Sequence, residues 1–194
     1  MFKHVAVVNG PGGHGKDAFV SACTLAASGL GLDVANISSI DPCREAARLL
    51  GYNPAHKTDH DRAFLVALKH AWLQWDPYGP TRYIIRCIKG LENALIFVHI
   101  RETDQIELLQ REASVMMPHV MIETIHIMRH GMPIPETDAD RGTRGLPGAL
   151  FQYDRFLVND SDLAALECLA RQYIAEIIGT YGIEGSTHNP GLRR

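Results

Sequence analysis

The sequence predicts an α/β fold in which a doubly wound, mostly parallel sheet of five strands carries helices on both faces. Short apolar stretches alternate with longer segments whose apolar residues recur at helical spacing, which is the pattern of successive βα units. Residues 95–100 are apolar apart from His99, as expected for a central parallel strand buried on both faces. A glycine-rich turn at residues 10–17 joins the first strand directly to the first helix.

The chain of 194 residues is long enough for one domain with a well-packed core. We expect strands at residues 5–9, 34–38, 95–100, 120–128 and 155–158. We expect helices at residues 16–28, 43–50, 57–76, 81–89, 103–114 and 161–179. Repeated Gly and Pro predict a loop between the last two strands. We therefore assign residues 1–181 to one domain and residues 182–194 to a polar, flexible tail.

Three of the expected helices begin with capping signals. Asp41 precedes Pro42, which predicts Asp41 as the N-cap and the proline at the first helical position. Thr58 and Asp61 have the spacing of a capping box, although Asp stands where Glu is usual. Ser161 is the expected cap of the last helix.

Residues 10–17 match the pattern of a phosphate-binding loop, in which two glycines enclose four residues and a lysine follows. Glycine here lets backbone N–H groups surround a polyphosphate, which side chains would obstruct. The helix that begins at the loop directs the positive end of its dipole at the same place. We therefore predict that ATP is bound by Gly10, Pro11, Gly12, Gly13, His14, Gly15, Lys16 and Asp17.

Lys16 and Asp17 have distinct expected roles in this P-loop. Lys16 should contact the β- and γ-phosphates and stabilise the transition state. Asp17 stands where a Ser or Thr oxygen usually reaches Mg²⁺, and a carboxylate is also a hard oxygen ligand, directly or through water. Alternatively, Asp17 only stabilises the positive end of the helix.

Composition excludes several classes of protein. The net charge is −3, so no global basic field marks a non-specific duplex binder. Four scattered cysteines without a C-x-x-C pair indicate reduced thiols in the cytoplasm. The first strand starts close to residue 1, so we expect no signal peptide, and no apolar run approaches the ~20 residues of a membrane span. The ten histidines show no metal-binding spacing.

Ligands of such sheets bind at the carboxyl ends of the strands. Asp41 follows the second strand and is either a helix cap or a general base towards an acceptor hydroxyl. Arg101 follows the third strand and is expected to clamp a phosphate in the crevice. Glu102 either holds a magnesium-bound water or is an acid in the first turn of a helix.

Phosphoryl transfer needs positive charge in a site that excludes water, so we expect a mobile lid at about residues 129–150. Its arginines are Arg129, Arg141 and Arg144, of which Arg141 is assigned a catalytic role and the other two are assigned to acceptor binding.

An acceptor should dock on the segment at about residues 41–90. The expected basic contacts there include Arg62 and Arg82, with Lys69 and Arg86 as further candidates. The same segment carries aromatic residues, of which one or two could stack on a base: Trp72, Trp75, Tyr78 and Tyr83.

Several stretches resemble known kinases. The loop at residues 10–17, with its Asp in place of Ser or Thr, resembles that of bacteriophage deoxynucleoside monophosphate kinases and the related phosphomevalonate kinases. Softer patterns at residues 61–69, 75–83, 97–102 and 153–160 resemble phage and prophage P-loop kinases of that group. The resemblance implies a nucleoside-monophosphate-kinase-like P-loop fold, with ATP and Mg²⁺ at residues 10–17 and the host cytoplasm as its location.

Within that group the chain is similar to 5-hydroxymethyluracil DNA kinase, a phage family that phosphorylates the hydroxymethyl group of a modified pyrimidine in DNA on the way to hypermodified thymidine. The chain has His99 to Glu102 where we would expect the Asp-Arg pair of a monophosphate kinase, and its lid is short for enclosing a free nucleotide. Both departures favour a DNA base, flipped out of the duplex. The net charge favours the alternative, a free deoxynucleoside monophosphate. A third alternative is a GTPase or ATP-driven switch, although no N-K-x-D-like motif is evident.

Overall fold

The computed structural model describes residues 3–55, 58–92, 95–133 and 151–181. In this part of the chain five strands form one sheet in the order β2-β3-β1-β4-β5, and every neighbouring pair is parallel. The strands are β1 (Lys3–Asn9), β2 (Val34–Ser38), β3 (Leu95–His99), β4 (Val120–Met128) and β5 (Arg155–Val158). The predicted parallel α/β sheet is confirmed.

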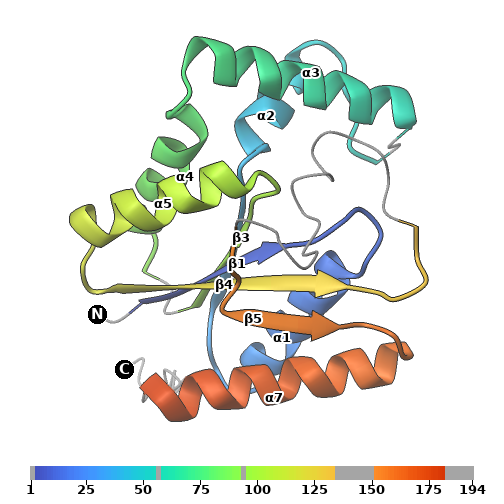
Figure 1. Cartoon of the computed structure of the whole chain (residues 1–194), viewed down its shortest axis with the longest axis vertical. Helices are drawn as coiled ribbons and strands as arrows, with labels where there is room; N and C mark the ends of the chain where they lie inside the picture. The colour runs from blue at the N-terminus through green and yellow to red at the C-terminus, as the bar shows by residue number, and fades with distance from the viewer. Residues whose placement is uncertain (1–2, 56–57, 93–94, 134–150, 182–194) are drawn as a thin grey trace, which may run out of the picture.

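Helices lie on both faces of this sheet (Figure 1). The described helices are α1 (Lys16–Ser28), α2 (Asp41–Leu49), α3 (Asp59–Trp75), α4 (Gly79–Gly90), α5 (Thr103–Met116) and α7 (Leu163–Tyr181). On one face, α1 and α7 bury a core that includes Phe19 and Tyr173. On the other, α4 and α5 bury a second core that includes Ile88 and Leu109. A smaller cluster joins α2 to α3 around Ala47. Among the described residues, we find no helix with the length and apolar character of a membrane span.

The strand order puts a switch point at β1. β3 and β4 follow one another along the chain but lie on opposite sides of β1, so the winding reverses there. Crevices outside the carboxyl ends of strands at such a point are the usual ligand sites of open α/β sheets. The loop at residues 10–17 begins directly after β1 and therefore lies at this position.

The observed first residues of the helices can be compared with the N-caps predicted from the sequence. The Thr58–Asp61 capping box is confirmed, because Asp61 N donates to Thr58 Oγ1 (3.2 Å) and Thr58 N donates to Asp61 Oδ2 (2.9 Å). The expected N-cap at Asp41 is wrong: α2 begins at Asp41 itself and Ile40 occupies the cap position. Asp41 Oδ2 instead accepts a hydrogen bond from Ser38 N (2.7 Å), which closes the turn before the helix.

Two other helix starts also differ from expectation. α4 begins at Gly79 and not at Thr81, because Pro80 fits the first turn, where a missing N–H breaks no helical hydrogen bond. Asp162, and not Ser161, caps α7, since Ala165 N donates to Asp162 Oδ1 (2.9 Å). The remaining boundaries lie within two residues of those expected.

A polar network is enclosed between the sheet and α7. Glu123 Oε2 accepts hydrogen bonds from Tyr173 Oη (2.8 Å) and His4 Nε2 (3.1 Å), and its Oε1 accepts one from Arg155 Nε (3.0 Å). Burial by itself would raise the pKa of Glu123, but these hydrogen bonds and the charge of Arg155 outweigh it and lower the pKa to about 2. The ionised carboxylate therefore stabilises the fold.

This network predicts an acid-dependent loss of stability. Because the folded-state pKa is lowered, the stabilisation is complete above about pH 4.5 and is lost as the pH falls towards 2. We expect Glu123→Gln to lower the free energy of unfolding by about 3 kcal/mol at pH 6 and by much less below pH 3. Urea denaturation at several pH values measures this, with the surface variant Glu167→Gln as control. A constant difference between Glu123→Gln and wild type from pH 6 to pH 2.5 would contradict the assignment.

Candidate functional site

The loop at residues 10–17 has a backbone that only glycine adopts readily at several positions. Gly10, Gly13 and Gly15 have φ values of 138°, 82° and 97°. A Cβ on Gly10 would lie 2.1 Å from the carbonyl oxygen of Ile127 in β4. A Cβ on Gly15 would lie 2.2 Å from Asn159 Nδ2. The positive φ values favour glycine at all three positions, and at Gly10 glycine is also required for the close approach of β4.

The start of α1 is open for an anion. Gly15 is the N-cap and has no side chain, so no cap side chain bonds to the first N–H groups of the helix. Lys16 Nζ donates to the carbonyl oxygens of Gly10 and Pro11, both at 2.5 Å. The ammonium is therefore held over the loop, where a phosphate contact requires it.

Side chains around the loop hold it against the sheet. Asn9 Oδ1 accepts from Gly10 N (2.5 Å), and Asn9 Nδ2 donates to the carbonyl oxygens of Ile100 (2.9 Å) and Arg101 (3.0 Å). This asparagine joins the carboxyl ends of β1 and β3. Sequence reasoning missed it, although a polar residue that ends an apolar strand just before the first glycine is a usable signal.

His14 anchors the other side of the loop. It is 1 % exposed, its Nδ1 accepts a hydrogen bond from Arg129 N (3.0 Å), and its carbonyl accepts one from Asn159 Nδ2 (3.1 Å). These bonds connect the loop to the residues that follow β4 and β5. The predicted P-loop residue His14 thus lies in the loop, but its ring is turned into the protein.

Asp17 lies at the start of α1 with its side chain 96 % exposed, and its Oδ1 is 4.0 Å from His99 Nδ1. Burial is the main cause that lowers the pKa of His99, and Lys16 lowers it further, while Asp17 opposes both. His99 is therefore neutral at pH 7, and the Asp17 carboxylate is open to solvent. A single exposed carboxylate beside a phosphate loop fits Mg²⁺, which binds proteins through one or two carboxylates and takes phosphate and water oxygens for the rest. The described residues contain no larger cluster of metal-ligating side chains.

Asp41 and Arg101 both lie at the carboxyl edge of the sheet, as predicted. Asp41 Oδ2 is bonded to Ser38 N and its Oδ1 accepts from Arg44 Nη1 (2.8 Å), so both carboxylate oxygens have partners. Arg101 has an exposed side chain, while its backbone carbonyl is held by Asn9. The structure therefore brings these two residues to the same edge of the sheet as the loop.

A buried ion pair adds a further carboxylate to this edge. Lys69, on α3, is 5 % exposed, and its Nζ donates to Glu102 Oε2 (2.6 Å) and to Ser39 Oγ (2.8 Å). Ser39 follows β2 and Glu102 follows β3, so one lysine joins the ends of both strands. Sequence reasoning named Lys69 only as one candidate among several, because nothing in a helical pattern separates a buried lysine from a solvated one.

Three other predicted arginines have partners within the described residues. Arg62 Nη1 is 3.0 Å from Asp59 Oδ1 and Arg82 pairs with Asp76, both pairs within the acceptor segment and both guanidinium groups mostly exposed. Arg129 Nη2 donates to the carbonyl of Ser161 (3.4 Å). The remaining two residues, Arg141 and Arg144, lie outside the described residues, as does most of the expected lid.

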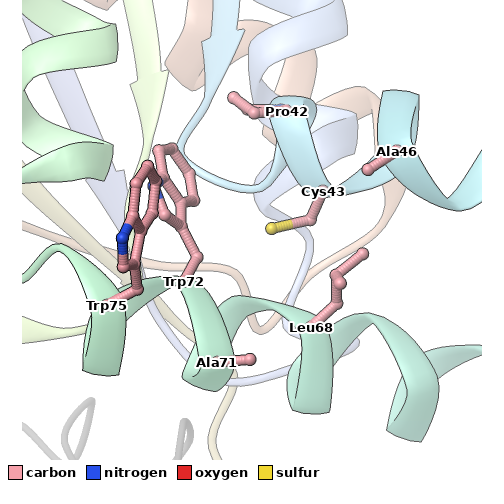
Figure 2. A pocket seen from close by; sticks show the side chains of 7 residues that line it. All are labelled: Pro42, Cys43, Ala46, Leu68, Ala71, Trp72 and Trp75. Atoms are coloured by element: carbon pink, nitrogen blue, oxygen red, sulfur yellow. The ribbon is translucent and has the colours of Figure 1, made fainter.

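An apolar pocket of about 310 Å³ lies between α2 and α3 (Figure 2). It is lined by Pro42, Cys43, Ala46, Leu68, Ala71, Trp72 and Trp75. In Figure 2 both indole rings lie at the same end of the pocket, and Trp75 is 83 % exposed. Of the aromatic residues expected to stack on a base, these two border a pocket. Tyr83, on α4, is instead partly buried against the core that α4 and α5 form with the sheet.

Comparison with known proteins bears on the fold. No family model matches the sequence, and none of the curated proteins matches it. Among solved structures, a presumed kinase from Chloroflexus aurantiacus has a TM-score of 0.50 at 12 % identity, over 89 % of this chain and 98 % of that chain. The chain shares the α/β fold of that structure.

Two further structures are similar over most of their length at lower scores. A gluconokinase from Sinorhizobium meliloti has a TM-score of 0.45 at 15 % identity, over 92 % of this chain and 95 % of that chain. The Mycobacterium tuberculosis APS kinase CysC, in complex with AMPPNP and APS, has 0.44 at 13 %, over 94 % and 99 %. At these identities the likeness concerns the fold, and the chemistry has to be argued from the site itself.

The loop geometry predicts unequal costs for two glycine substitutions. Gly51 also has a positive φ, 89°, but a Cβ there would meet no atom within 4 Å. We expect Gly51→Ala to cost about 1–2 kcal/mol of stability, since only backbone strain is added. Gly10→Ala should cost more than about 3 kcal/mol, because the Ile127 carbonyl cannot move without breaking the sheet. Chemical denaturation of both variants tests this, and equal costs would show that Gly10 is not closely packed.

Proposed function

We propose that the chain is an ATP-dependent phosphotransferase. The observation that carries the proposal is the loop after β1, whose glycine backbone, uncapped helix start and overlying Lys16 ammonium converge on one place at the switch point of the sheet. This combination is built for a polyphosphate. The fold shared with a presumed kinase from Chloroflexus aurantiacus supports a kinase over other uses of the loop.

The residues present have separate tasks in this reaction. Loop N–H groups and Lys16 would hold the β- and γ-phosphates, and Arg101 would neutralise charge on the transferred group. Asp17 would hold Mg²⁺, which when bound neutralises phosphate oxygens and orients them for in-line attack. His14, turned into the protein, serves as an anchor of the loop.

We propose the hydroxymethyl group of 5-hydroxymethyluracil in DNA as the acceptor. The acceptor oxygen forms a bond to the γ-phosphorus, the bond to the β–γ bridging oxygen breaks, and ADP leaves with the electron pair. The hydroxyl proton passes to a crevice carboxylate, Asp41 or a neighbour. The Trp72–Trp75 pocket supports a planar base as the group that is bound. Arg62 and Arg82 are each paired with an acid, so a free acceptor phosphate would have to compete with that acid.

A free deoxynucleoside monophosphate is the second candidate acceptor. The pocket volume of about 310 Å³ is within the range of small-ligand sites, and the net charge of −3 provides no general attraction for DNA. A non-kinase P-loop NTPase is a third candidate, supported only by the loop itself.

The deciding experiment offers γ-labelled ATP to DNA containing 5-hydroxymethyluracil and, separately, to free deoxynucleoside monophosphates. Unmodified DNA of the same sequence is the matched control. Label in the modified DNA alone is the expected result. Label in a free nucleotide alone would show that the acceptor is a deoxynucleoside monophosphate and not the modified DNA. ATP binding without transfer to either substrate would contradict the phosphotransferase proposal and leave a nucleotide-binding protein.

Lys16 is expected to be required for transfer and not for folding. Lys16→Ala should lower kcat by about 10²–10³-fold or more, because it removes a charge that stabilises the transition state. Its thermal midpoint should stay close to wild type, since Lys16 is only half-buried. Steady-state kinetics with Lys89→Ala, an exposed lysine of α4, as control measure this. Full activity in Lys16→Ala would end the proposal.

The lid arginines give a prediction that rests on the sequence alone. Arg141→Ala and Arg144→Ala should each lower kcat by at least about tenfold with little change in ATP affinity, because they act on charge that develops during transfer. Binding and turnover are measured separately, and Arg48→Ala, an exposed arginine of α2, is the control. Unchanged kinetics in both variants would remove the lid from the mechanism.

A further inference from the structure

We propose that Glu102 is the carboxylate that receives the proton of the acceptor hydroxyl, and that Lys69 is the positioning residue that holds it. This inference rests on the proposed function with a hydroxyl as acceptor, and it identifies the crevice carboxylate that the mechanism needs. It is carried by the buried Lys69–Glu102–Ser39 cluster, which three different elements bring to the carboxyl ends of β2 and β3.

Glu102 is not in its position to cap a helix. It occupies the N-cap of α5, yet its side chain makes no capping hydrogen bond. Glutamate is not among the preferred N-cap residues, and Asp, Asn, Ser or Thr would serve the helix better. Its side chain turns instead to Lys69, so capping does not explain its position.

Burying Lys69 costs free energy, because its charged ammonium group loses water. At 5 % exposure its ammonium has lost most of its hydration, and the ion pair and the Ser39 hydroxyl compensate for that loss. A buried ion pair is seldom more stabilising than apolar residues of the same size, so stability alone gives no reason for it. Fixing the direction of a carboxylate is a role that an apolar pair cannot perform.

The cluster lies beside the phosphate loop. Asn9, the residue before Gly10, donates to the carbonyl oxygens of Ile100 and Arg101, so the chain is tied to the loop one residue before Glu102. Ser39 N also donates to the carbonyl of His99 (3.0 Å), whose ring lies 4.0 Å from Asp17. The backbone that leads into Glu102 is therefore hydrogen-bonded to Asn9, the residue before the loop.

The cluster also borders the apolar pocket. Leu68, which precedes Lys69, and Cys43 both line it. Burial is the main cause that raises the pKa of the Cys43 thiol, and the charges of Lys69 and Glu102 act on it with opposite signs, so both charges are near this wall. A base held by Trp72 and Trp75 would thus lie in a pocket whose wall at Cys43 is near the Glu102 carboxylate.

The carboxylate has a free oxygen for the reaction. Oε2 is bound to Lys69, whereas Oε1 accepts no hydrogen bond from the described residues, and the side chain is 22 % exposed. In the step, the acceptor O–H bond breaks and its proton goes to Oε1 as the O–P bond forms and ADP leaves. The proton then passes to solvent. Asp41 is less suited, because both of its oxygens already accept hydrogen bonds.

The test compares Glu102→Gln, Lys69→Met and the double variant, with Glu45→Gln, an exposed glutamate of α2, as the matched control. Each is assayed for transfer from γ-labelled ATP to DNA containing 5-hydroxymethyluracil, for ATP affinity and for thermal midpoint. We expect Glu102→Gln to lower kcat by about 10²–10⁴-fold with the KM for ATP within about twofold of wild type. Glu45→Gln should match wild type.

The double variant separates positioning from folding. Because Glu102→Gln leaves a buried ammonium unpaired, it should fold less stably than the double variant, which removes both charges. If Lys69 acts only through Glu102, Lys69→Met lowers kcat in the wild-type background and not in the Glu102→Gln background. If the fold-loss of kcat in the double variant equals the product of the losses in the two single variants, Lys69 acts independently of Glu102 and the positioning role is overturned.

The activity of the wild type tests the proposed function, whereas the activity of the variants tests the role of Glu102. An active wild type with a Glu102→Gln variant of equal kcat would overturn the proton-acceptor role alone. A greater loss in Asp41→Asn than in Glu102→Gln would assign the proton to Asp41. A wild type that transfers no phosphate to the modified DNA would overturn the hydroxyl acceptor and with it this inference, whatever the variants do.

Discussion

The close approach of the loop backbone to the neighbouring strands is the constraint on which the site depends. Gly10 leaves no space for a Cβ against the Ile127 carbonyl, and Asn9 ties the same point to the end of β3. His14 fixes the far side of the loop through Arg129 and Asn159. Because hydrogen bonds and sterics hold the loop from three strands, its N–H groups are oriented before any ligand binds, which lowers the cost of binding a phosphate.

Charge is distributed unevenly around this loop. Lys16 lies over the loop and Arg101 follows β3, whereas burial lowers the pKa of the nearby His99. Burial lowers the pKa of His126 to about 4, with Lys16 and His14 adding to the effect. The negative groups follow different strands along the chain: Asp17 comes after β1, Asp41 after β2 and Glu102 after β3. Lys69 balances Glu102 and also connects α3, the helix of the acceptor segment, to this edge.

The sequence predicted elements well where a pattern extends over many residues, and less well where one residue decides. Strands β2, β4 and β5 begin and end where expected, since their apolar runs are bounded by polar residues. The starts of α2 and α7 were misplaced because Asp41 and Ser161 each have a neighbour that can take the cap position. The position of the glycine-rich loop was predictable, because an apolar strand, a run of glycines and a helical segment follow one another in the sequence. Asn9, Asn159 and the burial of Lys69 were not, because each depends on strands distant in sequence.

The sequence by itself determined the α/β class, the position of the loop and the identity of its lysine, because periodicity and glycine spacing are local properties of the chain. Tertiary structure alone decided which charges meet. Arg62 and Arg82 became surface pairs, Asp41 had both oxygens occupied, and Lys69 was buried against Glu102, which lies 33 residues away along the chain. The physical reason is that the desolvation and pairing of a charge depend on which elements pack together. The residue pattern of one helix does not show which side chains of distant elements it will meet.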